Sequence, residues 1–301
     1  MDKSFIEELN CICKSVAENE PMMKHTTFRI GGPADVFVCP DESEIAQVID
    51  LCKKENVPFM IMGNGSNMLV SDAGIEGVVI SLGNAMGDIT VEGCQITAGA
   101  GAILSKVANA AYDNSLTGFE FAAGIPGSVG GAVVMNAGAY GGEIKDCLKS
   151  VKVLTAEGRV ETRSADSLNL SYRHSVFMEE KGAVVLSATF EFEPGNRDEI
   201  KGRMDELKTQ RVEKQPLNFP SAGSTFKRPE GYFAGKLIDD AGLRGFCIND
   251  AAVSEKHCGF VVNKGNATCD DVLKLMKHVD EVVFERNGVH LEPEIRIVGR
   301  F

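Results

Sequence analysis

The order of apolar and polar positions near the start of the chain predicts alternating strands and helices. After a short amphipathic N-terminal helix, residues 34–39 form an apolar run that is typical of a strand. Apolar residues then recur at helical spacing behind Asp41-x-x-Glu44, which resembles a capping box at a helix start. Residues 59–62 are entirely apolar and lead directly into a glycine-rich loop. We therefore expect a βαβ unit that places this loop at the carboxyl end of a strand, where α/β folds tend to bind ligands.

The middle of the chain carries many short apolar runs separated by turn residues, which is typical of a strand-rich region. One segment among them, residues 103–112, shows helical spacing instead. This part of the chain is therefore expected to be α+β. The strands expected here are residues 78–82, 89–91, 94–98, 151–155, 160–162 and 183–192.

The last third begins with a charged segment, residues 196–212, which predicts a helix. The proline-rich segment 216–220 follows and suggests a joint between domains. We expect residues 1–206 to form a first module, with lobes of about 1–76 and 77–206, and residues 207–301 to form a second domain. The elements expected in that domain are helices at 233–240 and 270–285 and strands at 259–262 and 294–298.

Composition and charge narrow the class of protein. Of 301 residues, 44% are hydrophobic and 25% are charged, which is typical of a globular protein with sizeable cores. The net charge of −12 at pH 7 argues against a nucleic-acid partner. The N-terminus does not resemble a signal peptide, and no apolar stretch reaches the length of about 20 residues that a membrane span needs. We therefore expect a cytoplasmic protein that is not inserted in a membrane.

The cysteines and histidines do not suggest a metal site. The nine cysteines include no C-x-x-C pair, and the five histidines are scattered without the spacing of metal ligands. Reduced, mostly buried thiols are typical of a cytosolic protein. We expect no bound metal.

Two glycine-rich stretches are the most informative feature of the chain. They are residues 63–67 and residues 124–131, and the second continues into 136–141. Glycine lets backbone N–H groups approach an anion closely and permits positive φ, so the amides of such loops can converge on a diphosphate. Either stretch alone is also compatible with a tight turn, but the pair favours a long nucleotide ligand.

Familiar nucleotide and hydrolase motifs are excluded by spacing. The only Gly-Lys pair, Gly235-Lys236, is not followed by the Ser or Thr that a Walker A loop requires. No glycines have the G-x-G-x-x-G spacing of a dinucleotide-binding strand and helix. Ser128 has Pro126 where a hydrolase nucleophile elbow needs glycine. The nucleotide is therefore expected to bind in another kind of fold.

Three polar clusters are candidates for chemistry: residues 171–175, 222–227 and 291–296. Each alone has an ordinary explanation. Arg173 could be a solvated surface residue, Ser224 could cap a helix, and Glu294 could form an ion pair with Arg296. Spacing alone does not bring them together.

Taken in order, these motifs resemble the UDP-N-acetylenolpyruvoylglucosamine reductase family over nearly the whole chain. Seven motifs in register are far more specific than any one of them. The chain resembles the shorter subtype of the family, because it lacks an inserted segment, and it has Arg228 where other members carry asparagine. The matching motifs are residues 26–34, 63–67, 124–131, 136–141, 172–173, 223–227 and 291–294.

The resemblance implies an α+β fold with a two-lobed FAD-binding module of the vanillyl-alcohol oxidase type, followed by a substrate-binding domain. It implies FAD and NADPH as cofactors and a UDP-sugar as substrate. The cofactor-binding residues that it implies are Thr26, Thr27, Gly63, Asn64, Gly65, Ser66, Asn67, Gly124, Ile125, Pro126, Gly127, Ser128, Gly130 and Gly131. The substrate-binding residues that it implies are Tyr140, Tyr172, Lys214, Lys227 and Arg296.

The resemblance also implies the reaction, in which an enolpyruvyl ether is reduced to a lactyl ether for peptidoglycan synthesis. Hydride addition to the terminal vinyl carbon leaves negative charge beside a carboxylate, so a fixed cation is needed. Arg173 would hold that carboxylate, Glu294 would donate a hydrogen bond if burial keeps it protonated, and Ser224 would give the proton to C2. His174 adjoins the arginine and is a candidate for tuning it. Glu292 is expected to form a surface ion pair.

Two alternative functions are considered. One is a flavoprotein oxidase with the same module, which would pass electrons to oxygen rather than to the enolpyruvyl ether. The other is a nucleotide-binding protein without catalysis, in which the glycine loops bind but Arg173, Ser224 and Glu294 do not converge.

Overall fold

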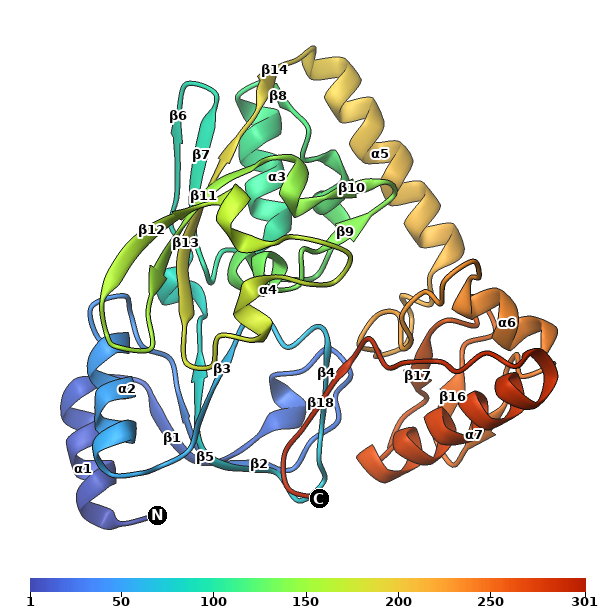
Figure 1. The fold of residues 1–301 in the computed structure, drawn as a ribbon, viewed down its shortest axis with the longest axis horizontal. Coiled ribbons are helices and arrows are strands. Elements are labelled where there is room, and N and C mark those ends of the chain that lie inside the picture. The colour runs from blue at the N-terminus through green and yellow to red at the C-terminus, as the bar shows by residue number, and fades with distance from the viewer. The chain divides into compact units, whose positions relative to one another are not determined.

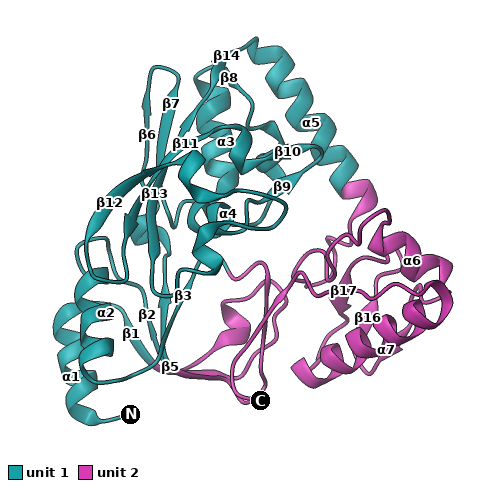
Figure 2. Ribbon diagram, viewed as in Figure 1, with its two compact units in different colours: residues 1–17, 36–64, 77–211 teal, residues 18–35, 65–76, 212–301 magenta.

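The computed structural model describes residues 1–301, which divide into two compact units (Figure 2). Unit 1 comprises residues 1–17, 36–64 and 77–211, and unit 2 comprises residues 18–35, 65–76 and 212–301. Each unit has a hydrophobic core of its own. The chain therefore contributes two N-terminal segments to the unit that holds its C-terminal third. The expected functional division between residues 206 and 207 stays a prediction.

Figure 1 labels the elements in chain order. The α-helices are α1 Lys3–Ile12, α2 Ile45–Lys54, α3 Leu104–Asp113, α4 Val129–Val134, α5 Arg197–Lys214, α6 Ala234–Asp240 and α7 Cys269–Asn287. The strands are β1 Val16–Pro21, β2 Pro33–Val38, β3 Phe59–Met62, β4 Met68–Val70, β5 Ile75–Ser81, β6 Ile89–Glu92, β7 Gln95–Gly99, β8 Leu116–Thr117, β9 Gly138–Ala139, β10 Gly142–Glu143, β11 Leu148–Leu154, β12 Val160–Ser164, β13 Val184–Glu191, β14 Glu193–Pro194, β15 Cys247–Ile248, β16 Ala251–Val253, β17 Val261–Asn263 and β18 Arg296–Val298. The short 3₁₀ helices are η1 Met22–Lys24, η2 Asn84–Met86, η3 Glu120–Gly124, η4 Ile144–Asp146, η5 Ala165–Leu168 and η6 Val176–Met178.

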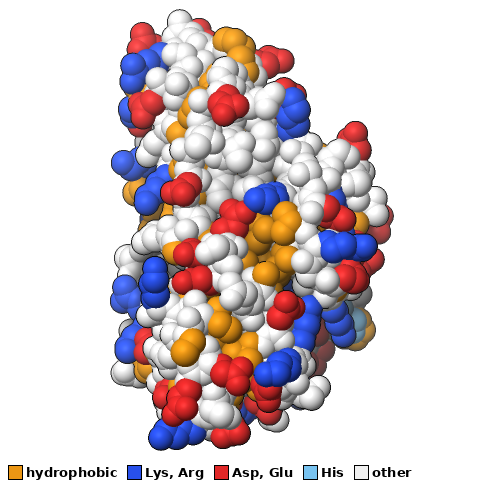
Figure 3. All heavy atoms as spheres, turned by 90° about the vertical axis from the view of Figure 1, so that its left-hand side faces the viewer, with side chains coloured by type: hydrophobic (Ala, Val, Ile, Leu, Met, Phe, Trp, Pro, Cys, Tyr) orange, Lys and Arg blue, Asp and Glu red, His pale blue; other side chains and the backbone are white.

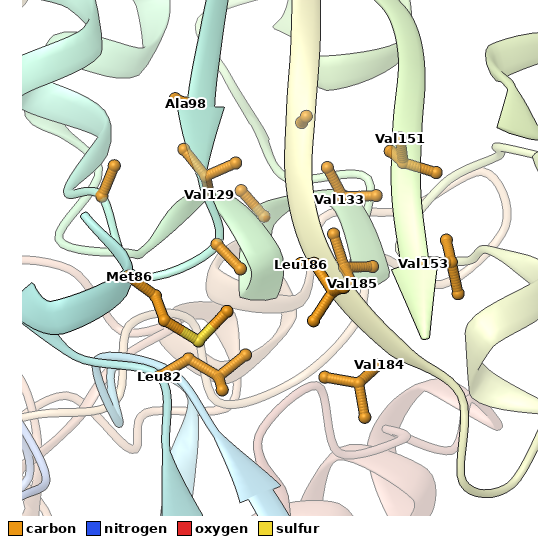
Figure 4. Packing of buried hydrophobic residues seen from close by; sticks show 14 of the residues in the cluster. Leu82, Met86, Ala98, Val129, Val133, Val151, Val153, Val184, Val185 and Leu186 are labelled. Carbon is orange, nitrogen blue, oxygen red and sulfur yellow. The ribbon is translucent and has the colours of Figure 1, made fainter. Parts of the chain in front are cut away.

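A five-stranded antiparallel sheet is the centre of unit 1, with strand order β12-β11-β13-β7-β6. Helices α3 and α4 pack against it (Figure 1). In Figure 4, Val133 of α4 lies beside Val185 and Leu186 of β13, and Val129 lies nearer the strand that carries Ala98; all belong to the same core. Burial of each such side chain stabilises the fold by about 1.5–3 kcal/mol relative to exposure. This sheet confirms the expected α+β character of the region.

A four-stranded sheet has the order β1-β2-β5-β3, and β3 runs parallel to β5. The expected strand–helix–strand order of β2, α2 and β3 is confirmed, although β5 lies between the two strands in the sheet. Strand β3 ends at Met62, so the first glycine-rich loop does follow the carboxyl end of a strand. Before α2, the Asp41 carboxylate accepts from the N–H of Glu44 at 3.1 Å and the Glu44 carboxylate accepts from the N–H of Asp41 at 3.0 Å. The helix itself begins one residue later, at Ile45.

Unit 2 contains helices α6 and α7 with the three-stranded antiparallel sheet β15-β16-β17. Strand β18 pairs in parallel with β4, and the two lie side by side in Figure 1. Helix α7 starts with a capping box between Thr268 and Asp271 and ends at Gly288, whose φ of 67° suits glycine. The carboxylate of Asp72 accepts from the first two N–H groups of α7, at 2.9 and 3.1 Å. The segment 65–76 is thereby tied to the C-terminal part of the chain.

Helix α4 and strand β1 are among the elements that were not expected from the sequence. Helix α4 has the sequence VGGAVV, in which glycine and valine have low helix propensity, and it forms because its apolar side chains are buried. Strand β1 has the largely polar sequence VAENEP and lacks an apolar pattern.

No helix is both long and apolar enough to cross a membrane. On the face that Figure 3 shows, Lys and Arg side chains are interspersed with Asp and Glu rather than gathered in one basic patch.

Candidate active site

The two glycine-rich loops meet in unit 1. The side-chain amide of Asn64 donates to the carbonyl oxygen of Pro126 at 2.6 Å. The second loop is also held by the segment before α3, since the N–H of Leu104 donates to Gly127 at 3.1 Å and that of Val129 donates to Ala102 at 2.8 Å. Two loops that are about sixty residues apart along the chain are therefore in direct contact through Asn64 and Pro126.

Ser128, at the start of α4, has a buried side chain whose hydroxyl lacks a hydrogen-bond partner. Such a group costs about 1–3 kcal/mol when it stays unsatisfied, so a ligand oxygen is its natural partner. A β-carbon added to Gly63 would overlap this hydroxyl. The orphaned hydroxyl and the bare backbone facing it fit a cofactor that lies against both loops.

Other members of the two loops have more ordinary surroundings. Gly130 packs its backbone on Ala100, where a β-carbon would be too close, so packing accounts for this glycine. Gly124 and Gly131 are exposed, while Ile125 is half-buried and its N–H donates to Ala122 at 3.0 Å. Their roles toward a cofactor stay predictions.

Arg173 lies at the tip of a tight turn in unit 1. Ser171 and His174 form a two-way backbone pair beneath it, and the turn gives Arg173 a φ of 55°. The guanidinium lies 5.1 Å from the ring centre of Tyr172 and donates to the carbonyl oxygen of Gly138 at 3.3 Å. A left-handed backbone at a residue other than glycine costs about 1–3 kcal/mol and is typical of functional sites.

Asn136 anchors this turn from within the core. Its fully buried side-chain amide donates to the carbonyl of Ser171 at 2.9 Å and to the carboxylate of Glu143 at 3.0 Å. Its amide oxygen accepts from the N–H of Lys145 at 3.0 Å. The motif that contains Asn136 therefore positions the turn that carries Tyr172 and Arg173.

Arg211 is a residue that the sequence reasoning missed. It lies on α5 in unit 1, and its guanidinium covers Gly124, where an added β-carbon would be 3.0 Å from Nη1. The side chain is half-buried and has no ion-pair or hydrogen-bond partner, so burial lowers its pKa while the nearby Tyr140 opposes that shift. An unpaired, partly buried cation beside a glycine loop is a candidate for binding a ligand anion. The only available signal was its position in a helix full of charged residues, which does not single it out.

Tyr140 is 36% exposed, and its φ of 53° is also left-handed. Partial burial raises the pKa of the Tyr140 phenol, although the nearby Arg211 opposes the shift, so the hydroxyl stays neutral as a hydrogen-bond donor. Tyr140 and Arg211 thus present a neutral donor and a cation near the second glycine loop.

Ser224 and Glu294 are brought together in unit 2. Residues 225–227 pair antiparallel with residues 292–294, through a bridge between Phe226 and Pro293. The N–H of Glu294 donates to the carbonyl of Thr225 at 2.8 Å, so Thr225 lies opposite Glu294 and Ser224 is the residue before Thr225. Both Ser224 and Glu294 are half-buried.

The end of the first glycine loop is tied to the same region of unit 2. Thr27 donates from its N–H to the carbonyl of Gly65 at 3.2 Å and from its hydroxyl to Ser221 at 2.7 Å. The side-chain amide of Asn67 donates to the carbonyl oxygen of Glu294 at 3.2 Å. Thr26 is buried and donates to Ile30 at 3.1 Å, which holds the preceding turn together.

The remaining candidates are cations at the surface of unit 2. Lys227 forms an exposed ion pair with Glu292 at 3.1 Å, as expected for that carboxylate. Lys214 is the last residue of α5, and Arg296 opens β18 with an exposed side chain. Ser66 is half-buried between Gly65 and Asn67.

Arg173 belongs to unit 1, whereas Ser224 and Glu294 belong to unit 2. Their convergence on one substrate stays a prediction.

Comparison with known proteins identifies the family. The domain family described as "UDP-N-acetylenolpyruvoylglucosamine reductase, C-terminal domain" matches residues 215–298, and the family described as "FAD binding domain" matches residues 33–164. The UDP-N-acetylenolpyruvoylglucosamine reductase of Agathobacter rectalis is 58% identical over 311 residues, which cover 99% of this chain and 98% of the relative. This chain belongs to the UDP-N-acetylenolpyruvoylglucosamine reductase family.

Other members of the family are also similar to this chain over nearly its whole length. The reductase of Lachnoclostridium phytofermentans is 53% identical over 306 residues, covering 99% of this chain and 98% of its own length. The crystal structure of the UDP-N-acetylenolpyruvylglucosamine reductase from Thermus caldophilus aligns with a TM-score of 0.79 and 33% identity over 94% of this chain and 98% of that one. The expected family, α+β fold and FAD-binding module are thereby confirmed.

Proposed function

We propose that this protein reduces the enolpyruvyl ether of UDP-N-acetylglucosamine enolpyruvate to UDP-N-acetylmuramate, with NADPH as reductant, in peptidoglycan precursor synthesis. The observation that carries the proposal is the pairing of the Ser224 segment with the Glu294 segment, in a chain of this family. The residue before Thr225 carries a hydroxyl and Glu294 carries a carboxyl, and such a pair suits the protonation of a carbon next to a carboxylate.

The residues present fit FAD. Its isoalloxazine ring, when bound, would accept a hydride from NADPH and supply a hydride, with its two electrons, to the substrate. The loops 63–67 and 124–131 would hold it, with the orphaned hydroxyl of Ser128 and the bare backbone at Gly63 as the closest fit. Thr27 would support the first loop through its hydrogen bond to Gly65, and Thr26 holds the turn that carries Thr27 through its bond to Ile30.

Reduction of the substrate adds a hydride to its terminal vinyl carbon and a proton to C2, so that the carbon–carbon double bond is lost. Charge accumulates on the carboxylate and C2 before the proton arrives. Arg173 would hold that carboxylate with its planar, permanently charged guanidinium, and Tyr172 stacks against the guanidinium to fix its direction. The strained turn at Arg173 suits a residue whose orientation must be set before the substrate binds.

Ser224 would donate the proton to C2, and Glu294 would donate a hydrogen bond to the developing oxyanion. A serine hydroxyl is a weak acid, but the enolate is a strong base and the donor is already in place. Tyr140, Lys214, Lys227 and Arg296 would bind the UDP part and the phosphates of the substrate. For Lys227 this requires the exposed pair with Glu292 to open, which costs about 1 kcal/mol or less.

The test is an anaerobic spectrum of the purified protein, recorded before NADPH, after NADPH, and after the enolpyruvyl substrate. NADPH should bleach a flavin spectrum and the substrate should restore it. If oxygen restores the spectrum and the enolpyruvyl substrate does not, the protein is a flavoprotein oxidase. A colourless protein that takes up no flavin would instead indicate a nucleotide-binding protein without this activity.

Variants separate the individual roles. Ser224→Ala should still be bleached by NADPH but should be reoxidised at least about a hundredfold more slowly, because only the proton donor is lost. Glu294→Gln should slow the same step, whereas Glu292→Gln should stay within about threefold of wild type because its carboxylate is in an exposed ion pair. Equal effects of the two glutamate substitutions would contradict the assignment of Glu294.

A further inference from the structure

The backbone on both sides of Glu294 is held by neighbours from different parts of the chain. Its N–H donates to the carbonyl of Thr225 at 2.8 Å, and its carbonyl oxygen accepts from the side-chain amide of Asn67 at 3.2 Å. Because both peptide groups flanking the α-carbon are fixed, the direction in which the Glu294 side chain leaves the backbone is fixed as well.

Asn67 holds this segment in two ways. Its side chain donates to Glu294, and its own backbone carbonyl accepts from the N–H of Arg296 at 2.9 Å. Strand β4 begins at the next residue, Met68, whose partner in β18 is Arg296. The Asn67 side chain therefore extends the parallel ladder by one step, with an amide N–H of the side chain in place of a backbone N–H.

Asn67 is also the last residue of the first glycine loop, whose first residue, Gly63, faces the Ser128 hydroxyl at the expected cofactor site. Gly65, two residues earlier, is linked through Thr27 to Ser221, in the segment that leads to Ser224. The end of this loop is thus tied to both segments that carry the acid and the proton donor.

We propose that Asn67 is a positioning residue for Glu294, through which the cofactor loop sets the direction of the acid. This role is separate from any contact with the cofactor, because the bond to the Glu294 carbonyl uses only one of the two N–H groups of the Asn67 amide. The inference rests on the proposed function for the chemistry of Glu294, but the hydrogen bonds that it invokes are independent of that chemistry.

The test compares the flavin-loaded forms of wild type, Asn67→Ala and Asn67→Asp. Aspartate has the shape of asparagine but presents oxygen where the amide donated, so it separates hydrogen bonding from space filling. The control is Asn64→Ala, in the same loop, because the Asn64 side chain donates to Pro126 and not to the Glu294 segment.

The first readout is amide hydrogen exchange of a peptide covering residues 291–298. The backbone amides of this peptide should exchange about tenfold faster in Asn67→Ala and Asn67→Asp, because loss of the bond to the Glu294 carbonyl makes opening of the segment easier, and at the wild-type rate in Asn64→Ala. Unchanged exchange in both Asn67 variants would overturn the proposal.

The second readout is the rate of each half-reaction. With each rate expressed per bound flavin, reoxidation by the enolpyruvyl substrate should fall about tenfold or more in both Asn67 variants, and by more than reduction by NADPH falls. Wild-type reoxidation in Asn67→Asp, or loss of flavin that accounts for the whole defect, would contradict a positioning role. If the reduced wild-type protein is not reoxidised by the enolpyruvyl substrate, the proposed function fails, and the exchange measurement alone decides the role of Asn67.

Discussion

The N–H of Glu294 donates to the carbonyl oxygen of Thr225 at 2.8 Å, and this bond places two segments about seventy residues apart in one register. Thr225 is itself rigid, because it is buried and its hydroxyl accepts from the N–H of Val261 at 2.8 Å. Ser224, which precedes Thr225, and Glu294, which lies opposite Thr225, therefore lie on a fixed scaffold rather than on a free loop. A proton donor and an acid that must act within one reaction benefit from such prior alignment.

The first prediction concerns Ser128→Ala. Removing a buried hydroxyl that has no partner should leave the free energy of unfolding of the flavin-free protein unchanged or raise it by about 1 kcal/mol. The same change should weaken FAD binding about tenfold or more, because a hydrogen bond to a charged group contributes about 1.5–3 kcal/mol. Chemical denaturation of the flavin-free protein and titration with FAD measure the two effects. A variant that is less stable and binds FAD normally would show that the hydroxyl has a structural partner instead.

The second prediction concerns the bare backbone at Gly63. Gly63→Ala should lower both stability and flavin retention, because the new β-carbon would overlap the Ser128 hydroxyl. The double variant Gly63→Ala/Ser128→Ala should recover much of the stability, since the Ser128 β-carbon would be 3.6 Å from the new methyl group. We expect a coupling energy of about 1 kcal/mol or more in denaturant unfolding.

Gly202→Ala is the matched control for this cycle. Gly202 lies within α5, and an added β-carbon there would meet nothing within 4 Å. This substitution should stabilise the protein by up to about 1 kcal/mol through helix propensity. Strictly additive effects at Gly63 and Ser128 would contradict the close approach.

The sequence predicted most of the regular elements, because their apolar spacing is local information. Helix α7 and strands β3 and β13 lie within a few residues of their expected positions. Helix α4 could not be predicted, because its glycines oppose a helix until the core forms around it. The sequence also could not predict that segment 65–76 belongs to unit 2, because this depends on the pairing of β4 with β18, a strand more than two hundred residues away.

In the candidate site, too, the local motifs could be predicted from the sequence, but the contacts between distant segments could not. The glycine loops were visible in the sequence, but the orphaned hydroxyl of Ser128 depends on what surrounds it in three dimensions. Ser224 and Glu294 were chosen by resemblance, and the pairing of their two segments depends on a strand register that no local pattern contains. Arg211 was overlooked because α5 is charged along its whole length, and only the fold shows which arginine covers Gly124.

The third prediction concerns Arg211. Arg211→Gln should weaken binding of one diphosphate ligand about tenfold or more, either FAD by the flavin-free protein or the UDP-sugar by the flavin-loaded protein. Separate titrations with FAD and with the UDP-sugar distinguish the two ligands. The affinity that remains in the variant should depend less on salt concentration than the wild-type affinity does. Arg203→Gln is the control, since Arg203 lies on the same helix in an exposed pair with Glu206 at 2.6 Å. If neither titration changes, Arg211 does not bind the anion.

The fourth prediction is a pH dependence at the turn that carries Arg173. His174 lies 3.0 Å from the carboxylate of Glu179, whose hydrogen bond raises the pKa of the imidazole above its ordinary value of 6.5. A raised pKa in the folded state means that the pair stabilises the protein fully below about pH 6.5. The contribution is then lost as the pH rises through the folded-state pKa.

His174→Gln should therefore lower the unfolding temperature by about 2 °C or less at pH 6, because the pair is exposed, and by nothing measurable at pH 9. Glu179→Gln should give the same pH-dependent loss, since it removes the other partner of the pair. Thermal unfolding of the three proteins at several pH values measures this. A difference that grows toward alkaline pH would mean that the imidazole acts in its neutral form, through a contact other than the one with Glu179.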